Sequence, residues 1–591
     1  MTEHLNLPPH AVAREDRADG TILLRAPHAL GPCARSTGAW LDHWADVAPD
    51  RTFLAERSGN GWRRLSYGEA RARVMRLAAG LRDAGPSGPV LILSGNSIDH
   101  ALLTLAAQYV GIVSVPVAEQ YSLIPAAHGR LRHVVDLVRP GLVFADDPVA
   151  YGPAFDIAGC PALCSGTGAP GVTPLTALEQ DGDVADAHAR VGPDTVAKLL
   201  LTSGSTSDPK AVETTQAMMT TNQAQLATCL PFLGARPPVL VDWLPWNHVF
   251  GGSHNFNLVL AHGGTLYIDD GKPLPARFGR TVENLGARSG TISFNVPVGF
   301  AQLVRALDAD PALRETYFRD LDMIFYAGAS LPQDVWAALE RMALETAGRM
   351  PLITTSWGLT ETAPAALLQH QPSKGAGIVG VPLPGVEVKL VDTGDGRMDV
   401  RVRGPSIFER YHRDPVKTAA AFDDEGFFVT GDAMRFADAA DMTAGLRFDG
   451  RLSEDFKLSS GTWVQAANVR LALLAALGPL AQDVVICGHG RDGLGALIFP
   501  GRDAAEGFRD AGALRSDAAQ AIRERLRTHL NSTHGSARRV TRALVLAEPP
   551  DIGAGETTAK GNLNFARILD RRAALVERLY DDQDAATILG L

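Results

Sequence analysis

The chain has 591 residues, a length that predicts a large body with a smaller appended domain, because a single hydrophobic core rarely grows beyond about 250–300 residues. Hydrophobic residues make up 46% and charged residues 21%, as in an ordinary globular protein. The formal net charge is −10 and the sequence has no long run of lysine or arginine, which argues against a nucleic-acid-binding protein and against a protein held on anionic membranes.

The cysteines and the N-terminus bear on the cellular compartment. The five cysteines are odd in number and scattered, and they lack the CxxC pairing of a zinc site. The first 16 residues carry charges and prolines where a signal peptide needs an apolar stretch. The most apolar segment, Leu102 to Val117, is too short and too interrupted to span a bilayer, and it predicts a buried helix that runs into a strand. We therefore expect a cytoplasmic protein without a membrane span.

Taken in chain order, the first clear element is a helix over Tyr67 to Asp83. Ser66 and Glu69 form a capping-box pattern at its start, and apolar residues recur on one face. Short β-branched runs, separated in several places by helical patterns, follow at 90–93, 113–117, 142–144, 239–243, 265–268, 292–296 and 323–326. This alternation predicts an α/β fold in which helices cover parallel sheets. Residues 153–174 are rich in glycine and proline and predict a surface loop.

A second unit begins near Gly450, where the charge density rises. Strand patterns at 484–487, 496–499 and 543–546 and a helical pattern at 518–530 predict a small α+β domain of ordinary size. We place the boundary between Asp449 and Ser453, which gives a large domain over residues 1–450 and a small one over residues 451–591.

The segment 199–210 reads LLLTSGSTSDPK, a buried strand followed by a loop of hydroxyls and glycine that closes on a lysine. Small residues let backbone N–H groups approach phosphate oxygens, hydroxyls donate further hydrogen bonds, and lysine supplies charge. A flexible serine and glycine turn is the alternative interpretation, and the spacing is not that of a Walker loop. The candidate phosphate-binding residues are Thr202, Ser203, Gly204, Ser205, Thr206 and Lys210.

Three more motifs follow in order: TTSWGLTET at 354–362, TGD at 430–432 and DGRLSEDFKLSSG at 449–461. Together with TSGSTSDPK they resemble the superfamily of adenylate-forming enzymes, which includes acyl-CoA synthetases, peptide-synthetase adenylation domains and luciferases. The stretches 243–275, YAGASLPQDVW from Tyr326 and FDGRLSEDFKLSSGTWV from Phe448 are similar to the bacterial feruloyl-CoA synthetase branch. The resemblance covers most of the chain.

The resemblance implies ATP, Mg²⁺ and CoA as cofactors and assigns roles in binding ATP. Thr360 would hydrogen-bond the α-phosphate, and Glu361 would hold Mg²⁺, a hard cation that prefers carboxylate and phosphate oxygens. The residues assigned to adenosine are Gly328, Ala329 and Trp357 around the adenine, and Asp432 and Arg451 at the ribose. Taken one at a time, such residues more often belong to turns, loops or core.

Three further residues complete the candidate site. His248 would stand at the mouth of the acyl pocket, with a satisfied core histidine as the alternative. The resemblance also implies that the small domain is mobile about a hinge at residues 451–453 and presents Lys457 for thioester formation. Lys560 is the candidate for the C-terminal adenylation lysine, although a gap-free match to the common pattern puts Asn562 at that position.

The expected reaction joins a carboxylic acid, ATP and CoA to give acyl-CoA, AMP and pyrophosphate through an acyl-adenylate, with ferulate or a related hydroxycinnamate as the acid. One alternative is an adenylate-forming enzyme that acts on another aromatic or fatty acid or on a carrier-protein thiol. A second is a catalytically inactive nucleotide-binding regulatory protein. The expected partners are small molecules and no nucleic acid; the sequence leaves open the ring substitution of the acid and the oligomeric state.

Overall fold

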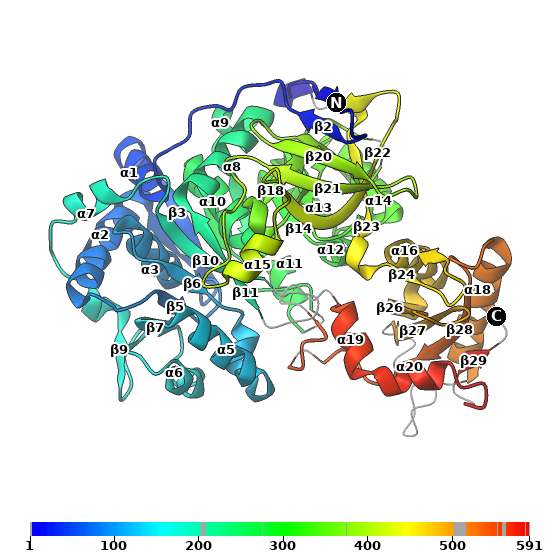
Figure 1. The fold of residues 1–591 in the computed structure, drawn as a ribbon. Coiled ribbons are helices and arrows are strands. Elements are labelled where there is room, and N and C mark those ends of the chain that lie inside the picture. The colour runs from blue at the N-terminus through cyan, green and yellow to red at the C-terminus, as the bar shows by residue number, and fades with distance from the viewer. Residues whose placement is uncertain are drawn as a thin grey trace.

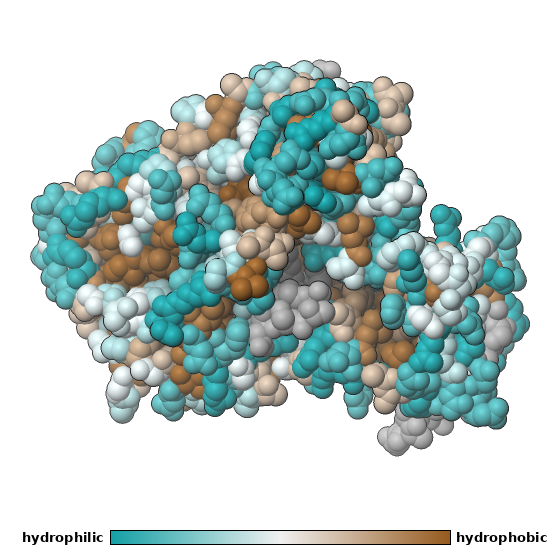
Figure 2. Space-filling view, viewed as in Figure 1, coloured by the Kyte–Doolittle hydropathy of each residue, from teal (hydrophilic) through white to brown (hydrophobic). Residues whose placement is uncertain are grey.

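The computed structural model describes residues 3–202, 209–274, 276–373, 375–501, 516–551, 553–557, 563–584 and 587–589. A large N-terminal domain, coloured blue to yellow in Figure 1, is followed by a smaller C-terminal domain coloured yellow to red. Hydrophilic residues dominate the face shown in Figure 2, as the composition predicts. No helix within the described ranges is both long enough and apolar enough to cross a membrane.

A seven-stranded sheet forms the first half of the large domain. Its order is β11 (Lys210–Thr215), β10 (Val196–Thr202), β6 (Ser114–Pro116), β5 (Val90–Ile92), β7 (Leu142–Ala145), β8 (Ala162–Cys164) and β9 (Val172–Pro174). Neighbours pair in parallel except β10 with β11. Side chains alternate between faces, so Val90 and Ile92 join one apolar core while Leu91 joins another. Burial on both faces explains why these strands read as continuous apolar runs.

Helices cover both faces of this sheet (Figure 1). The first core contains residues of α2 (Tyr67–Ala84) and α3 (Ile98–Tyr109), and the second contains residues of α5 (His128–Val138) and α6 (Gly152–Ala158). The predicted capping box at α2 is confirmed: the Ser66 hydroxyl accepts from the Glu69 N–H, and the Glu69 carboxylate accepts from the Ser66 N–H at 2.8 Å. The remaining short elements here are α4 (Glu119–Leu123) and α7 (Ala185–Arg190).

The prediction of a surface loop over residues 153–174 is wrong. This stretch contains most of α6 together with β8 and β9. Pro153 lies in the first turn of α6, where its missing N–H costs nothing, and the short apolar run Ala162–Cys164 extends the sheet beside β7. Glycine and proline therefore mark the ends of short elements here.

Two smaller sheets complete the α/β part. One has the order β12 (Val239–Asp242), β13 (Thr265–Ile268), β3 (Thr52–Ser58) and β4 (Gly61–Ser66); the other is the parallel sheet β14 (Ile292–Asn295), β15 (Met323–Tyr326) and β16 (Leu352–Thr354). They confirm the strand predictions to within one residue. The helices of this region are α1 (Thr37–Val47), α8 (Gln216–Cys229), α9 (Phe232–Ala235), α10 (Phe256–Ala261), α11 (Phe278–Ala287), α12 (Pro297–Ala309), α13 (Pro311–Arg319) and α14 (Gln333–Ala347).

A nine-stranded antiparallel sheet, which the sequence did not predict, closes the large domain. Its order is β1 (Ala13–Asp16), β2 (Ile22–Arg25), β20 (Glu387–Asp392), β21 (Met398–Arg403), β22 (Phe428–Phe436), β23 (Leu446–Arg451), β19 (Ile378–Pro382), β18 (Ala365–Leu368) and β17 (Ser356–Gly358). β2 lies beside β20, so the start and the later part of the domain meet (Figure 1). Strands such as MDVRVR alternate apolar with charged residues and lack the continuous apolar runs of the parallel sheets.

The small domain is built on the sheet β26 (Ala481–Cys487), β27 (Leu494–Pro500), β28 (Val540–Val545) and β29 (Ile588–Leu589). The predicted strands and the predicted helix, α18 (Ser516–Ser532), are present. A β-ribbon of β24 (Phe456–Lys457) and β25 (Trp463–Val464) and the helix α16 (Ala466–Leu477) precede the sheet, while α19 (Phe565–Arg571) and α20 (Ala573–Leu579) follow β28. Apolar residues of α16, α18, β26 and β27 form its main core.

Candidate active site

The phosphate motif connects two antiparallel strands. β10 ends at Thr202, which pairs directly with Lys210 at the start of β11. Ser203, Gly204, Ser205 and Thr206 lie outside the described residues. The hydroxyl of Thr202 is shielded from solvent and has no hydrogen-bond partner among the described residues. On the far side of the motif, Nε2 of His133 in α5 lies 3.1 Å from the carbonyl oxygen of Pro209.

Lys210 and Glu361 meet on either side of Tyr411. The Tyr411 hydroxyl donates to Oε1 of Glu361 at 2.9 Å, and Nζ of Lys210 lies 4.0 Å from the centre of the Tyr411 ring. Burial lowers the pKa of Lys210, and the charge of Glu361 opposes this shift. Thr360 and Glu361 form the short turn η5 (Thr360–Thr362) and are 9% and 8% exposed, so each keeps only a small accessible area. The structure thus brings together the ammonium group of Lys210, the carboxylate of Glu361 and the hydroxyl of Tyr411.

A second cluster joins Trp357, Asp432 and Arg451. The indole N–H of Trp357 donates to Oδ2 of Asp432 at 2.8 Å, and Nε of Arg451 lies 3.4 Å from Oδ1. Strand pairing sets this geometry, because Asp432 on β22 is opposite Arg451 on β23. Burial raises the pKa of Asp432, while Arg451 and the indole N–H lower it. Glu361 also acts on the pKa of Asp432, so the two clusters are close enough to interact electrostatically.

Gly328 and Ala329 follow the buried strand β15 and are exposed. Gly328 has a φ of 89°, a conformation that strains other residues. β15 pairs with β16, which leads within three residues to Trp357, so these three residues of the predicted adenine site follow neighbouring strand ends.

His248 is half-buried and precedes the π-helical turn η4 (Phe250–Asn255). Its Nδ1 accepts a hydrogen bond from the Phe250 N–H at 3.1 Å, and its carbonyl oxygen accepts from the Gly252 N–H. These contacts tie His248 to the turn; its role at an acyl pocket stays a prediction.

The structure does not bring Lys457 to the large-domain cluster. Lys457 is exposed on β24, with Nζ 4.9 Å from the centre of the Trp463 ring. Lys560 and Asn562 lie outside the described residues. The preceding segment 553–557 packs on the large domain, since a Cβ atom built on Gly555 would overlap the guanidinium of Arg130, and one on Gly553 would lie 3.2 Å from the Ala126 side chain. Arg130 belongs to α5, the helix that contacts the phosphate motif through His133.

Among the described residues no group of three or more His, Cys, Asp or Glu side chains could hold a metal ion on its own. A single carboxylate fits Mg²⁺, which keeps several waters and takes further oxygens from substrate phosphates. Oε1 of Glu361 already accepts from Tyr411, which leaves Oε2 for that purpose. The residues present therefore suit a metal ion that arrives with a nucleotide.

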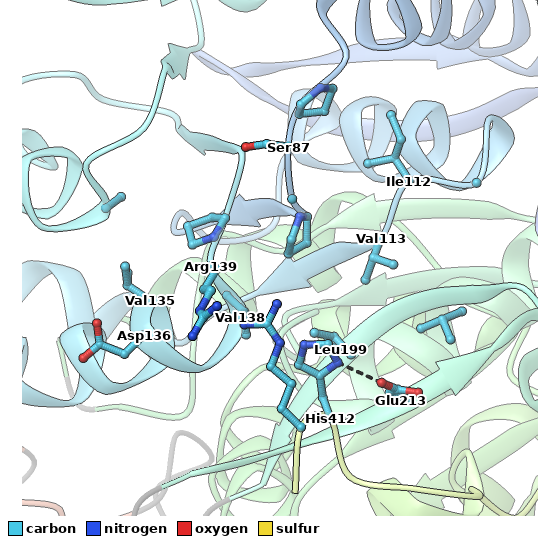
Figure 3. Close-up of a pocket in the computed structure, with 18 residues that line it drawn as sticks. Ser87, Ile112, Val113, Val135, Asp136, Val138, Arg139, Leu199, Glu213 and His412 are labelled. Carbon is cyan, nitrogen blue, oxygen red and sulfur yellow. Dashed lines mark hydrogen bonds and ion pairs between the residues drawn. The ribbon is translucent and has the colours of Figure 1, made fainter.

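A cavity of about 1190 Å³ lies elsewhere, at the amino ends of β5, β6 and β7 (Figure 3). Its polar side contains His412, whose Nδ1 is 2.8 Å from Oε1 of Glu213, and its apolar side includes Val113 and Leu199. None of the predicted site residues lines it. Parallel strands present their binding edge at their carboxyl ends, so this cavity is separate from the candidate site.

Sequence reasoning missed Tyr411. It lies 50 positions after Glu361, in a stretch without a phosphate or metal motif, so no local pattern marks it. The useful signal is general: a buried tyrosine hydroxyl needs a partner, and a buried carboxylate needs a donor.

Comparison with known proteins agrees with this architecture. The family model described as AMP-binding enzyme matches residues 41–412, and that of the AMP-binding enzyme C-terminal domain matches residues 455–584. The adenylation domain of the carboxylate reductase from Mycobacterium chelonae has a similar fold, with a TM-score of 0.73 at 19% identity, over 94% of this chain and 92% of that one.

The relatives are distant. The chain is 26% identical to 3-hydroxybenzoate–CoA ligase of Aromatoleum sp. (strain CIB) over 74% of this chain and 81% of the relative. It is 25% identical to long-chain-fatty-acid–CoA ligase FadD15 of Mycobacterium bovis, over 84% and 87%. It is 27% identical to probable acyl-activating enzyme 16, chloroplastic, of Arabidopsis thaliana over 43% of this chain, and the match spans only 37% of that relative. With the large-domain model matching more than half of its length, the chain belongs to the AMP-binding enzyme family.

Proposed function

We propose that the protein is an ATP-dependent carboxylate–CoA ligase that forms an acyl-adenylate and then an acyl-CoA thioester. The proposal rests on the proximity of two clusters, one of Lys210, Tyr411 and Glu361 and the other of Trp357, Asp432 and Arg451, with Glu361 close enough to act on the pKa of Asp432. The first suits phosphates with a divalent cation, and the second suits a nucleoside. Family membership supports the same activity.

In the first half-reaction a carboxylate oxygen of the acid bonds to the α-phosphorus of ATP, and pyrophosphate leaves with the electrons of the broken P–O bond. This step needs positioning and neutralisation of charge. Lys210 and the hydroxyl of Thr360 would hold phosphate oxygens, and Glu361 would hold the nucleotide-bound Mg²⁺, which supplies positive charge at the phosphates. Asp432, whose Oδ1 has no hydrogen-bond partner among the described residues, would accept from the ribose hydroxyls.

In the second half-reaction the CoA sulfur attacks the acyl carbon and AMP leaves with the mixed-anhydride oxygen, while the thiol proton goes to solvent. We infer that residues 1–450 form the adenylating domain and that residues 451–591 rotate about 451–453 between the two half-reactions. The segment 553–557 packs beside the helix that contacts the phosphate motif, which supports a first-step role for the loop that carries Lys560. Lys457 would serve the second step, after rotation.

We propose ferulate or a related hydroxycinnamate as the acid, with His248 at the mouth of its pocket. The support is the resemblance of residues 243–275 to the feruloyl branch and the similarity to the Aromatoleum 3-hydroxybenzoate–CoA ligase, which is named for a hydroxylated aromatic acid. The Mycobacterium bovis relative, a long-chain-fatty-acid ligase, supports a fatty acid as the alternative. A carrier-protein thiol is the alternative acceptor.

The test is ATP–pyrophosphate exchange with ferulate, coumarate, caffeate, benzoate and a medium-chain fatty acid, followed by AMP release with and without CoA. We expect exchange with a hydroxycinnamate and stimulation of AMP release by CoA. If none of these acids supported exchange, the ligase proposal would be overturned and a nucleotide-binding regulatory protein favoured. If only the fatty acid supported exchange, the hydroxycinnamate assignment would be overturned while the adenylation reaction would stand.

A further inference from the structure

Four rings pack together beneath the edge that carries the predicted adenine site. His254 lies 5.5 Å from Phe250, 5.4 Å from Phe294 and 5.1 Å from Phe325, measured between ring centres. Phe294 and Phe325 are paired residues of β14 and β15, and Gly328 follows Phe325 by three residues, at most about 10 Å of extended chain. An acyl group attached to an adenylate there would be close to this cluster.

The π-helical turn places His254 in the cluster. Gly251 and Gly252 lie so close to the preceding turn that a Cβ on either would overlap carbonyl oxygens of residues 244–246. The same turn directs Asn255 to Asp242, whose carboxylate accepts from the Asn255 side-chain N–H at 2.8 Å. This short segment therefore supplies both a ring of the aromatic cluster and a polar relay, meaning the hydrogen bonds that link His254, Asn255 and Asp242.

This relay fixes the tautomer of His254. Because Asn255 donates its amide N–H to Asp242, its side-chain oxygen is the atom that faces Nδ1 of His254, at 3.0 Å. An amide oxygen can only accept, so Nδ1 carries the proton and Nε2 is a bare acceptor. Burial lowers the pKa of His254 to about 4, which keeps the ring neutral near neutral pH.

The Nε2 acceptor is unsatisfied. It is shielded from solvent and has no hydrogen-bond partner within the described part of the chain, and His254 is 1% exposed. A buried polar atom without a partner is costly and calls for a reason such as a ligand. Its neighbours are phenyl rings, so the complementary ligand is an aromatic group that carries a hydrogen-bond donor.

We propose that His254 is a specificity-determining residue that accepts a hydrogen bond from a hydroxyl on the aromatic ring of the acid. This inference rests on the proposed ligase function and assigns to one residue the preference for a hydroxylated over an unhydroxylated aryl acid. An aliphatic tail would leave Nε2 unsatisfied, and a charged ring substituent such as a carboxylate would be repelled by its lone pair.

The experiment compares kcat/KM in AMP release for cinnamate, 3-hydroxycinnamate and 4-hydroxycinnamate. For the wild type we expect the better hydroxylated acid to exceed cinnamate by about tenfold or more. In His254→Phe this preference should fall to about threefold or less while activity with cinnamate is largely retained, because cinnamate has no ring hydroxyl to donate to Nε2 and so loses no hydrogen bond. His254→Gln supplies an amide oxygen as acceptor and should keep part of the preference for the hydroxylated acid. It also tests the proposal if His254→Phe does not fold.

Phe294→Leu is the matched control, since it alters the same cluster without removing an acceptor. It should lower kcat/KM by the same factor for all three acids. A wild type without preference for the hydroxyl, or a preference that survives in both His254 variants, would overturn the role of His254. Exchange with aliphatic acids alone would also overturn it while leaving the ligase proposal standing. Failure of every acid in pyrophosphate exchange would be the failure of the proposed function itself.

Discussion

Arg397 of the large domain and Asp455, two residues past the expected hinge, form a buried ion pair. Nη2 of Arg397 lies 2.7 Å from Oδ2 of Asp455, and each side chain is 4% exposed. Arg397 also pairs with Asp395 at 2.7 Å, so the cation is shared between a carboxylate of the large domain and one of the small domain. Removing one partner of such a buried pair is costly, because the other charge is left buried without compensation. The pair therefore favours the domain orientation seen here, in which residues 553–557 pack on α5.

We predict that Asp455→Asn weakens this orientation and slows pyrophosphate exchange by about fivefold or more. Thioester formation from pre-made acyl-adenylate should change less, because the proposed rotation assigns that step to another domain orientation. The two rates are measured separately on the same preparation. Asp582→Asn, which removes an exposed partner of Arg542 on the small domain, is the control and should leave both rates near the wild-type values. Equal losses in the two half-reactions would count against an orientation effect.

Glu361→Gln should slow adenylation by about 10²–10³, the usual cost of losing one electrostatic contact at a reacting phosphate. The fold should persist, because the glutamine oxygen can still accept from the Tyr411 hydroxyl. Tyr411→Phe is a graded control: it keeps the ring beside Lys210, removes only the donor to Glu361 and should cost about tenfold or less. Activity of Glu361→Gln within a few-fold of wild type at low Mg²⁺ would contradict the metal role.

Lys457→Ala and Lys560→Ala should fail in opposite half-reactions. We expect Lys457→Ala to spare pyrophosphate exchange and impair the CoA step. Lys560→Ala should slow adenylation by about 10²–10³ and leave thioester formation from pre-made adenylate near normal. The double measurement is decisive because a general loss of folding would lower both steps in both variants. A wild-type adenylation rate in Lys560→Ala would mean that another group neutralises the phosphate.

The sequence predicted the parallel strands and α2 well, because local patterns determine them: apolar runs such as Met323–Tyr326 are buried on both faces, and Ser66 caps α2 by a contact three residues away. Local patterns also mark the motif residues, whose roles stay predictions. The sequence could not predict the contacts of Tyr411 with Lys210 and Glu361, or of Arg397 with Asp455, since these depend on strand pairing across long sequence separations. The surroundings of the unsatisfied His254 nitrogen likewise depend on Phe294 and Phe325, which come from strands much later in the sequence.

Lys198 provides a test of the packing itself. It lies on β10, 4% exposed, and its Nζ donates to the carbonyl oxygen of Gly252 at 2.8 Å. It borders a small cavity with His100, Thr104 and Asn257, and no ion pair of Lys198 exists within the described residues. Burial without a counter-charge lowers the pKa of Lys198 from its ordinary value of 10.5 to about 7. The folded state therefore binds this proton less tightly than the unfolded state does.

The lowered pKa of Lys198 makes the free energy of unfolding depend on pH. Between about pH 7 and pH 10.5 the unfolded chain holds a proton on Lys198 that the folded chain has lost, so the stability of the wild type rises with pH across this window. Lys198→Met removes this term. The unfolding free energy of Lys198→Met relative to wild type should thus be highest at or below pH 7 and should fall by about 1.4 kcal/mol per pH unit toward pH 10. Urea unfolding curves at pH 6, 7, 8 and 9 measure the difference.

Lys389→Met is the control for this slope. Burial lowers the pKa of Lys389, but its hydrogen bonds to Glu425 and Asp423 raise it above the ordinary value, so both folded and unfolded states keep the proton below pH 10. The difference between Lys389→Met and wild type should therefore stay constant from pH 7 to pH 9, even though losing a paired lysine destabilises the fold. A constant difference for Lys198→Met as well would show that Lys198 keeps its proton in the folded protein across this pH range.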